Sequence, residues 1–255
     1  MITEYHRPAT LEAALKLLRR KQPQTRPLGG GTILVAPSSE PVAVIDLQAL
    51  KLNKISIRGK SLHIGATATL QALLDTQGLQ PALYASISHE ATYNLRQVAT
   101  VAGSLVAAGG RSPFAAAMLA LDAQLELQPK DETLSYGDLL ALRREKLRGK
   151  LITKVTVSLA PKLTYQYVAR TPADLAIVSV TVAQWPSGRT RLVVGGFGAA
   201  PVLALDGRDS SGLPEALENA LTGASDQWAS AEYRIEAGRA LLDRMTVQRP
   251  TSKVG

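Results

Sequence analysis

The chain contains no cysteine among its 255 residues. This absence excludes disulfide bonds, thiolate zinc sites, cysteine-ligated iron–sulfur clusters and a cysteine nucleophile. It is consistent with a reducing compartment. The opening residues include no apolar signal region, and no run approaches the roughly 18 uncharged apolar residues of a membrane span. We therefore expect a cytoplasmic protein without a membrane span.

Aromatic residues are also scarce, at 4% of the chain, whereas hydrophobic residues make up 45%. A sizeable core of alanine, leucine, valine and isoleucine is therefore expected, and disorder is not. The net charge is +8, but lysine and arginine are scattered, with the densest group at Arg143–Lys150. No basic helix with interleaved aromatic residues is present, which argues against nucleic acid as a partner. The three histidines show no metal-ligand spacing, so we predict no metal site.

Small residues are concentrated in two segments, and the first is RPLGGGTILVAP at Arg26–Pro37. Glycine has no Cβ, so this backbone can adopt a positive φ and approach another group closely. Successive main-chain N–H groups in such a turn can form a concave site for an anion, usually a phosphate. The segment matches neither GxGxxG nor GxxxxGK[ST]. The alternative interpretation is a tight turn before a buried strand at Ile33–Val35.

The second segment, Asn94–Gly110, carries no acidic residue and is rich in glycine, alanine, serine and threonine. Its centre, Thr100–Ser104, is interpreted as a second loop. Small side chains at this place allow either a ligand or another element of the fold to come close. Both interpretations remain open from the residues alone.

The apolar spacing predicts an α+β fold, with helices, loops and short strands alternating over the first 160 residues. Thr10 is expected to cap the first helix, and Ser112 with Pro113 to start a buried one. Predicted helices contain Leu11–Leu18, Leu70–Leu74, Leu83–Ala91, Phe114–Leu121 and Tyr136–Leu142; predicted strands are Val42–Leu47, Ile55–Ile57, Leu62–Ile64, Gln124–Leu127 and Leu151–Leu159.

A domain boundary is predicted at Ala160–Leu163, after which strands come first and helices follow. The first domain spans 1–160, with subdomains of about 1–56 and 57–160; the second spans 163–247, and 248–255 form a tail. Predicted strands of the second domain are Leu163–Ala169, Ala176–Trp185 and Arg191–Val194, and its helices are Pro214–Leu221 and Ala229–Met245.

The order of these segments resembles the FAD-binding, medium subunit of the xanthine dehydrogenase and carbon monoxide dehydrogenase family of molybdenum hydroxylases. GGGTILV resembles the family's AGGTDLL loop, and NLRQVATVAGSLVAA is similar to its IRN.GTIGGNLA segment. The remaining similar segments are VIDLQALKLNKI, LHIGATATL, MLALDAQLEL, RTPADLAIVSVTVA, VVGGFGAAP and SAEYR, which together cover nearly the whole chain.

The resemblance implies a PCMH-type FAD-binding domain of two α/β subdomains, followed by a small α+β domain with an antiparallel sheet. An elongated FAD would lie between the subdomains and the C-terminal domain. Electrons would come from iron–sulfur clusters on a small partner subunit and pass to NAD, a quinone or oxygen. The molybdenum cofactor would belong to a large partner subunit. We expect no catalytic side chain, because the flavin carries the electron chemistry.

The resemblance also implies the cofactor-binding residues. The first loop would hold the pyrophosphate through main-chain N–H groups, and the second would meet the phosphates and ribose from the other side. Asp174 aligns with a position near the flavin, and a turn aspartate is its alternative interpretation. The complete predicted set is Gly29, Gly30, Gly31, Thr32, Ile33, Thr100, Gly103, Ser104 and Asp174.

Four positions depart from the family pattern. Ile33 replaces a polar residue, Ala102 replaces a glycine, and Ser104 stands where asparagine is usual. Pro113 occupies the position of an aspartate that hydrogen-bonds the cofactor in the family, and proline offers neither an acceptor side chain nor an N–H. These departures motivate an alternative function, in which the chain keeps the fold as a structural or docking subunit without flavin.

Overall fold

The computed structural model describes residues 2–33 and 41–247. Their contacts divide the chain into two compact units. Unit 1 comprises Met1–Leu79, Ala91–Ala107 and Asp122–Leu159, and unit 2 comprises Gln80–Glu90, Ala108–Leu121 and Ala160–Gly255. The predicted boundary at residue 160 coincides with one passage of the chain between the units. At its other crossings between the units, the chain contributes two segments of its N-terminal half, Gln80–Glu90 and Ala108–Leu121, to unit 2.

Unit 1 begins with a three-stranded parallel sheet in the order β1-β3-β2. Its strands are β1 (Ile2–His6), β3 (Val42–Asp46) and β2 (Thr25–Leu28), and β3 is buried along its whole length. Helix α1 (Leu11–Leu18) packs Ala14 and Leu15 onto this sheet beside Ile45. The Thr10 hydroxyl caps α1 by accepting a hydrogen bond from the Ala13 N–H at 3.3 Å, as predicted.

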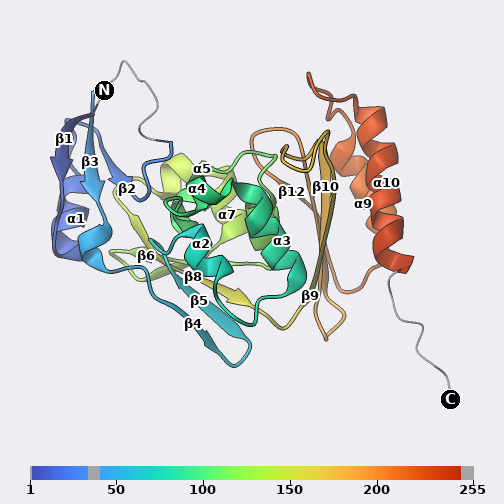
Figure 1. Ribbon diagram of the computed structural model, residues 1–255, viewed down its shortest axis with the longest axis horizontal. Helices are drawn as coiled ribbons and strands as arrows, with labels where there is room; N and C mark the ends of the chain where they lie inside the picture. Colours follow the sequence, from blue (N-terminus) through green and yellow to red (C-terminus); the bar gives the residue numbers. More distant parts are fainter. Residues whose placement is uncertain (1, 34–40, 248–255) are drawn as a thin grey trace. The chain divides into compact units, whose positions relative to one another are not determined.

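A five-stranded antiparallel sheet forms the rest of unit 1, in the order β4-β5-β8-β6-β7 (Figure 1). Alternate residues of its central strands are buried, as expected for a sheet with one covered face. The strands are β4 (Ile55–Arg58), β5 (Ser61–Gly65), β8 (Leu151–Ser158), β6 (Gln124–Gln128) and β7 (Glu132–Ser135). The helices are η1 (Gln48–Leu50), α2 (Leu70–Leu74), α4 (Tyr93–Arg96), α5 (Val101–Ala107), α7 (Tyr136–Ala141) and α8 (Arg143–Lys146).

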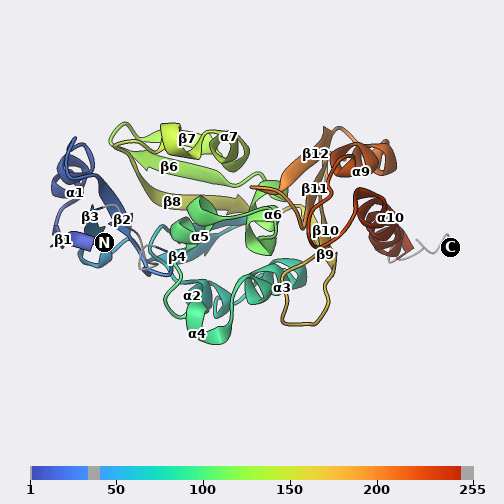
Figure 2. The same ribbon diagram turned by 90° about the horizontal axis from the view of Figure 1, so that it is seen from above.

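Unit 2 is built on a four-stranded antiparallel sheet in the order β12-β11-β10-β9. Helices α3 and α6 lie on one side of it and α9 and α10 on the other (Figure 2). The valines of β10 at alternate positions pack with α9 and α10 in one apolar cluster. The strands are β9 (Lys162–Val168), β10 (Val178–Gln184), β11 (Thr190–Gly195) and β12 (Val202–Gly207); the helices are α3 (Pro81–Glu90), α6 (Pro113–Ala120), α9 (Leu213–Leu221) and α10 (Ala231–Val247).

The α+β class is confirmed, and so are the predicted helices and strands listed above, with shifts of a few residues at their ends. The sequence analysis missed β1, β2, β7, β12 and the short helices η1, α4, α5 and α8. The loop predicted at Thr100–Ser104 is wrong, because α5 begins at Val101. The strand predicted at Ile33–Val35 is not found at Ile33, which lies in a turn, and Leu34 and Val35 fall outside the described residues.

Within residues 2–33 and 41–247, the longest helices are either too short or too polar to cross a lipid bilayer.

Candidate functional site

The glycine loop, Gly29–Ile33, leaves the carboxyl end of β2. Ligands of open α/β sheets commonly bind at this end of the strands. Gly31 has a φ of 72°, which favours glycine over residues with a side chain. Ile33 is 63% exposed, so its side chain does not fill the space beside the glycines.

This loop packs against the segment that leads into α5. A Cβ atom on Gly30 would lie 1.7 Å from the Val98 carbonyl oxygen, and one on Gly29 would lie 2.5 Å from Thr100 Oγ1. Neither distance is possible for a real side chain. At Gly30 main chain therefore meets main chain, and at Gly29 the Thr100 side chain lies against the main chain. The structure brings the two predicted segments together.

The main-chain N–H groups of the glycine loop have no partner within the part of the chain that the structure describes. None of those from Gly29 to Ile33 donates a hydrogen bond to another described residue. Main-chain donors are nearly always paired in folded proteins, by protein, water or ligand. A run of consecutive open donors on a glycine turn is the arrangement that binds a phosphate.

The start of α5 has the opposite character, because each N–H of its first turn is already used. Gly103 is exposed and Ser104 is half-buried, so the hydroxyl of Ser104 remains available where its N–H is not. The four hydrogen bonds run from Val101 N to Ala68 O (2.8 Å), Ala102 N to Ala66 O (3.1 Å), Gly103 N to Thr100 Oγ1 (3.3 Å) and Ser104 N to Thr100 O (2.8 Å).

Arg96 lies on α4, next to this segment in the chain. Its guanidinium donates from Nε to Gln71 Oε1 at 3.2 Å and from Nη1 to the Ala91 carbonyl at 2.7 Å. The first of these bonds joins α4 to α2.

In unit 2, Asp174 lies exposed in the loop between β9 and β10, and its N–H donates to the Thr171 carbonyl at 3.1 Å. This is a turn conformation, and the predicted cofactor role stays a prediction. Tyr165 on β9 is 7% exposed and stacks on Tyr167 at 5.4 Å between ring centroids. Tyr165 is therefore part of the core of unit 2. Burial raises the pKa of its hydroxyl.

Ser112 caps α6 as predicted, and a carboxylate that the sequence analysis missed lies beside it. Glu90, at the end of α3, accepts hydrogen bonds at Oε2 from Ser112 Oγ (2.7 Å) and from the Phe114 N–H (3.0 Å). Burial raises the pKa of Glu90 to about 7, against the lowering effect of these two bonds. No sequence signal indicates this role, since Glu90 is 22 residues from its partner Ser112. Pro113, at the start of α6, therefore adjoins a carboxylate supplied by another helix.

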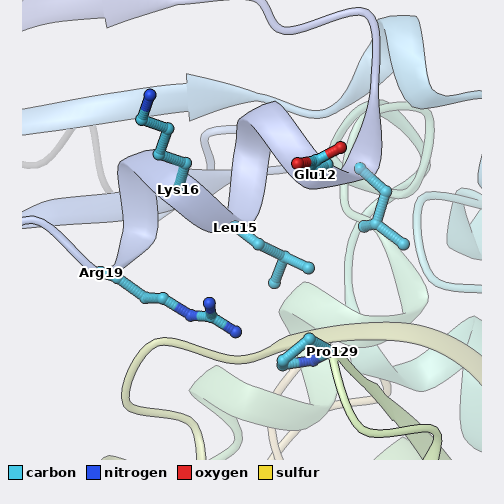
Figure 3. A pocket seen from close by; sticks show the side chains of 6 residues that line it. Glu12, Leu15, Lys16, Arg19 and Pro129 are labelled. Carbon is cyan, nitrogen blue, oxygen red and sulfur yellow. The ribbon is translucent and has the colours of Figure 1, made fainter.

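Two surface pockets lie away from these residues. The larger, of about 500 Å³, is lined by one face of α1 and by Pro129 (Figure 3). The other, of about 400 Å³, lies between the β10–β11 turn, at Ser187 and Arg189, and the end of β12, at Asp206. Neither is lined by a predicted site residue, and Figure 3 shows charged side chains, Glu12, Lys16 and Arg19, around an open surface.

Residues 1–159, which contain both segments of the site, match the family described as FAD binding domain in molybdopterin dehydrogenase. The chain belongs to this family. Its cofactor is FAD, and it is an FAD-binding subunit of the xanthine and carbon monoxide dehydrogenase type. The sequence-based resemblance is thereby confirmed.

The chain is also similar to individual proteins and to solved structures. The chain is 28% identical to the uncharacterized protein YgfM of Escherichia coli strain K12, over 92% of this chain and 91% of that protein. It is 33% identical to the xanthine dehydrogenase FAD-binding subunit of Escherichia coli O157:H7, over 48% of this chain and 45% of that subunit. A chain of the Cu,Mo-CO dehydrogenase crystal structure shares the fold, with a TM-score of 0.78 and 22% identity over 96% of both chains.

The residues of this FAD-binding subunit fit the diphosphate of FAD. The glycine loop offers consecutive N–H donors that no described residue occupies, and the Ile33 side chain is largely exposed. Hydrogen bonds to a charged phosphate are roughly twice as strong as those between neutral groups. The departure at Ile33 therefore leaves the donor set intact, and the departure at Ser104 leaves a hydroxyl that both donates and accepts.

Proposed function

We propose that this chain is the electron-transfer subunit of a molybdenum hydroxylase complex. It would receive electrons from iron–sulfur clusters on a small partner subunit and pass them to NAD, a quinone or oxygen. Substrate oxidation would take place on a large subunit that carries the molybdenum cofactor. The absence of cysteine supports this division, because this chain has no thiolate with which to ligate a cluster. We place the complex in the cytoplasm.

The observation that carries the proposal is the run of open N–H donors held against the start of α5. Gly29, Gly30, Gly31 and Thr32 would bind the diphosphate through the main chain. Ile33 would contribute its N–H alone, since its side chain is exposed. When bound, the flavin supplies the redox chemistry, and the protein binds and orients it.

The start of α5 would act through side chains rather than through amides. Ser104 would offer its hydroxyl, and Gly103 would keep the approach to the phosphates clear. Thr100 uses Oγ1 as an acceptor for the Gly103 N–H, and its hydroxyl hydrogen stays available as a donor. Asp174 of unit 2 remains a proposed contact near the flavin.

The purified chain or its complex should be yellow, with about one FAD per chain measured by absorbance after release of the cofactor. Gly30→Ala should abolish binding, because its Cβ would meet the Val98 carbonyl. Gly109→Ala is the matched control, since a Cβ there meets nothing within 4 Å. A colourless complex that is correctly assembled would reject the proposal. It would favour the alternative of a structural subunit without flavin.

A further inference from the structure

The chain has two tryptophans, and each lies under arginine side chains in unit 2. The Arg189 guanidinium carbon is 4.8 Å from the centroid of Trp185. Trp228 has two such neighbours, Arg111 at 4.6 Å and Arg170 at 5.0 Å. Cation–π attraction favours both arrangements. The two clusters differ in how their positive charges are balanced.

At Trp185 the charge is neutralised by a carboxylate. Arg189 donates from Nε to Asp206 Oδ1 at 2.8 Å and from Nη2 to Asp206 Oδ2 at 2.7 Å. This bidentate pair lowers the pKa of Asp206. In the Trp185 cluster, the positive charge of Arg189 is therefore balanced by a carboxylate of the same chain.

At Trp228 no such partner is present among the described residues. No carboxylate oxygen there lies within 4.0 Å of either Arg111 or Arg170. Arg111 is fixed by two main-chain carbonyls, those of Ala176 (2.8 Å) and Leu175 (2.5 Å). Exposed Arg170 donates to no described residue, so its planar set of donors is open. Two cations thus share one ring, and neither forms an ion pair with a carboxylate of the described residues.

The loop that carries Trp228 is held rigidly. Asp226 Oδ1 accepts hydrogen bonds from the Trp228 N–H at 2.8 Å and from Nη2 of Arg234 at 2.8 Å. Arg234 is fully buried and donates further to the carbonyls of Ile177 and Ala229. The main chain at Trp228 is therefore held in place, and preorganisation of this kind lowers the entropic cost of binding.

The surface around the indole has the composition of a protein interface. Trp228 is 39% exposed and the neighbouring Leu175 is 42% exposed. Tryptophan and arginine are the residues most enriched among those that dominate binding energy at interfaces. Neither of the two surface pockets described above includes these residues.

We propose that Arg111, Arg170 and Trp228 form a docking surface for a carboxylate-bearing segment of a partner subunit. A glutamate or aspartate of that segment supplies the counter-charge that Asp206 supplies at the other tryptophan. Arg170 binds the carboxylate through the N–H donors of its guanidinium, and the exposed indole packs against the apolar part of the segment. The inference rests on the proposed function only for the existence of a partner.

The test uses the full chain with Trp185→Phe, so that Trp228 is the sole indole. A capped hexaglutamate peptide is titrated while its fluorescence is recorded. We expect saturable binding that weakens with salt, and a loss of about tenfold or more in affinity on adding Arg170→Gln. Arg208→Gln, which removes an equal charge from another exposed site of unit 2, should leave the affinity unchanged.

Three outcomes would overturn the proposal: no saturable change, equal losses from both arginine variants, or tighter binding of inorganic pyrophosphate than of the peptide. The last would indicate a phosphate ligand instead. In the purified complex, Arg170→Gln should also lower the fraction of chain that co-elutes with its partners while FAD per chain stays the same. Loss of FAD from the wild-type chain would instead count against the proposed function, so the two failures are distinguishable.

Discussion

The glycine loop and the start of α5 are both made of small residues and pack against each other, yet their main chains are in opposite states. From Gly29 to Ile33 the N–H groups have no partner among the described residues. From Val101 to Ser104 every N–H has one. Small residues therefore have a different effect in each segment. In the glycine loop they leave main-chain N–H donors exposed, and at the start of α5 they allow the glycine loop to pack closely.

The sequence left open whether these segments bind a ligand or pack closely, and the contrast favours a different interpretation for each segment. Ligand binding through amides suits the glycine loop, and close packing suits the start of α5. If the contrast is functional, changes at the glycine loop should affect FAD far more than equivalent changes at α5.

The largest effect is expected for Gly30→Ala. Its Cβ would lie 1.7 Å from the Val98 carbonyl oxygen, and main chain cannot yield as a side chain can. We expect the free energy of unfolding to fall by about 3 kcal/mol, at the upper end for overpacking. FAD content should fall at least about tenfold. Chemical unfolding and cofactor release measure these two quantities, and a variant with full FAD content would contradict the contrast.

The start of another helix, α6, adds a pH-dependent stability to the comparison. Glu90 keeps its proton in the folded state up to a pH of about 7, whereas an unfolded glutamate loses it near 4.5. The stabilisation by the neutral carboxyl is complete below pH 4.5 and is lost as the pH rises to 7. The difference in unfolding free energy between wild type and Glu90→Gln should therefore fall by about 3 kcal/mol from pH 4 to pH 8.

The measurement is urea unfolding followed by tryptophan fluorescence, because both tryptophans belong to unit 2, as Glu90 does. An unchanged difference across this pH range would mean that the carboxyl of Glu90 is not buried. Glu218→Gln is a suitable control, since this glutamate pairs with Arg239 at the surface.

A smaller effect is expected for Ser104→Ala. If the Ser104 hydroxyl bonds the cofactor, its removal should weaken FAD binding by about 0.5–1.5 kcal/mol, or about two- to twelvefold. The fold should be unaffected, because the Ser104 N–H still donates to Thr100. Equilibrium dialysis against FAD gives the affinity. An unchanged affinity would mean that the Ser104 hydroxyl does not bind the cofactor.

The smallest effect is expected for Gly103→Ala. The added Cβ would lie 2.7 Å from Thr100 Oγ1, which is the end of a side chain and can rotate. Alanine also favours a helix over glycine by about 1 kcal/mol, which offsets the contact. The unfolding free energy should change by less than about 1 kcal/mol. A loss as large as that of Gly30→Ala would show that both segments tolerate side chains equally poorly.

The sequence predicted most of the fold because periodic apolar residues and end signals act locally. Thr10 and Ser112 were identified as helix caps, and the buried run at Val42–Leu47 as a strand. The missed strand β2 contains Pro27 and only four residues, too few for a period to emerge. Helix α5 was missed because its glycine and serine are typical of loops, and its start is fixed by pairing of Val101 with Ala68.

The site was predictable in its segments but not in its hydrogen bonds. Gly29 and Thr100 were both named from the sequence, yet nothing local tells which N–H groups are taken by distant carbonyls. The roles of Glu90 and Arg234 were equally hidden. Ser112 lies 22 residues from Glu90, and Ile177, one of several partners of Arg234, lies 57 residues from it; only the folded structure brings these pairs together.

Because Gly30 meets the Val98 carbonyl directly, the spacing of the two segments is set by peptide groups that every residue possesses. Side chains nearby can then change during evolution without altering the distance between the two segments. Ala102 and Ser104 are positions of this kind, because neither sets the distance between the segments. Divergence in such a family should be slow at the glycine that sets the distance and fast at the positions that merely border it.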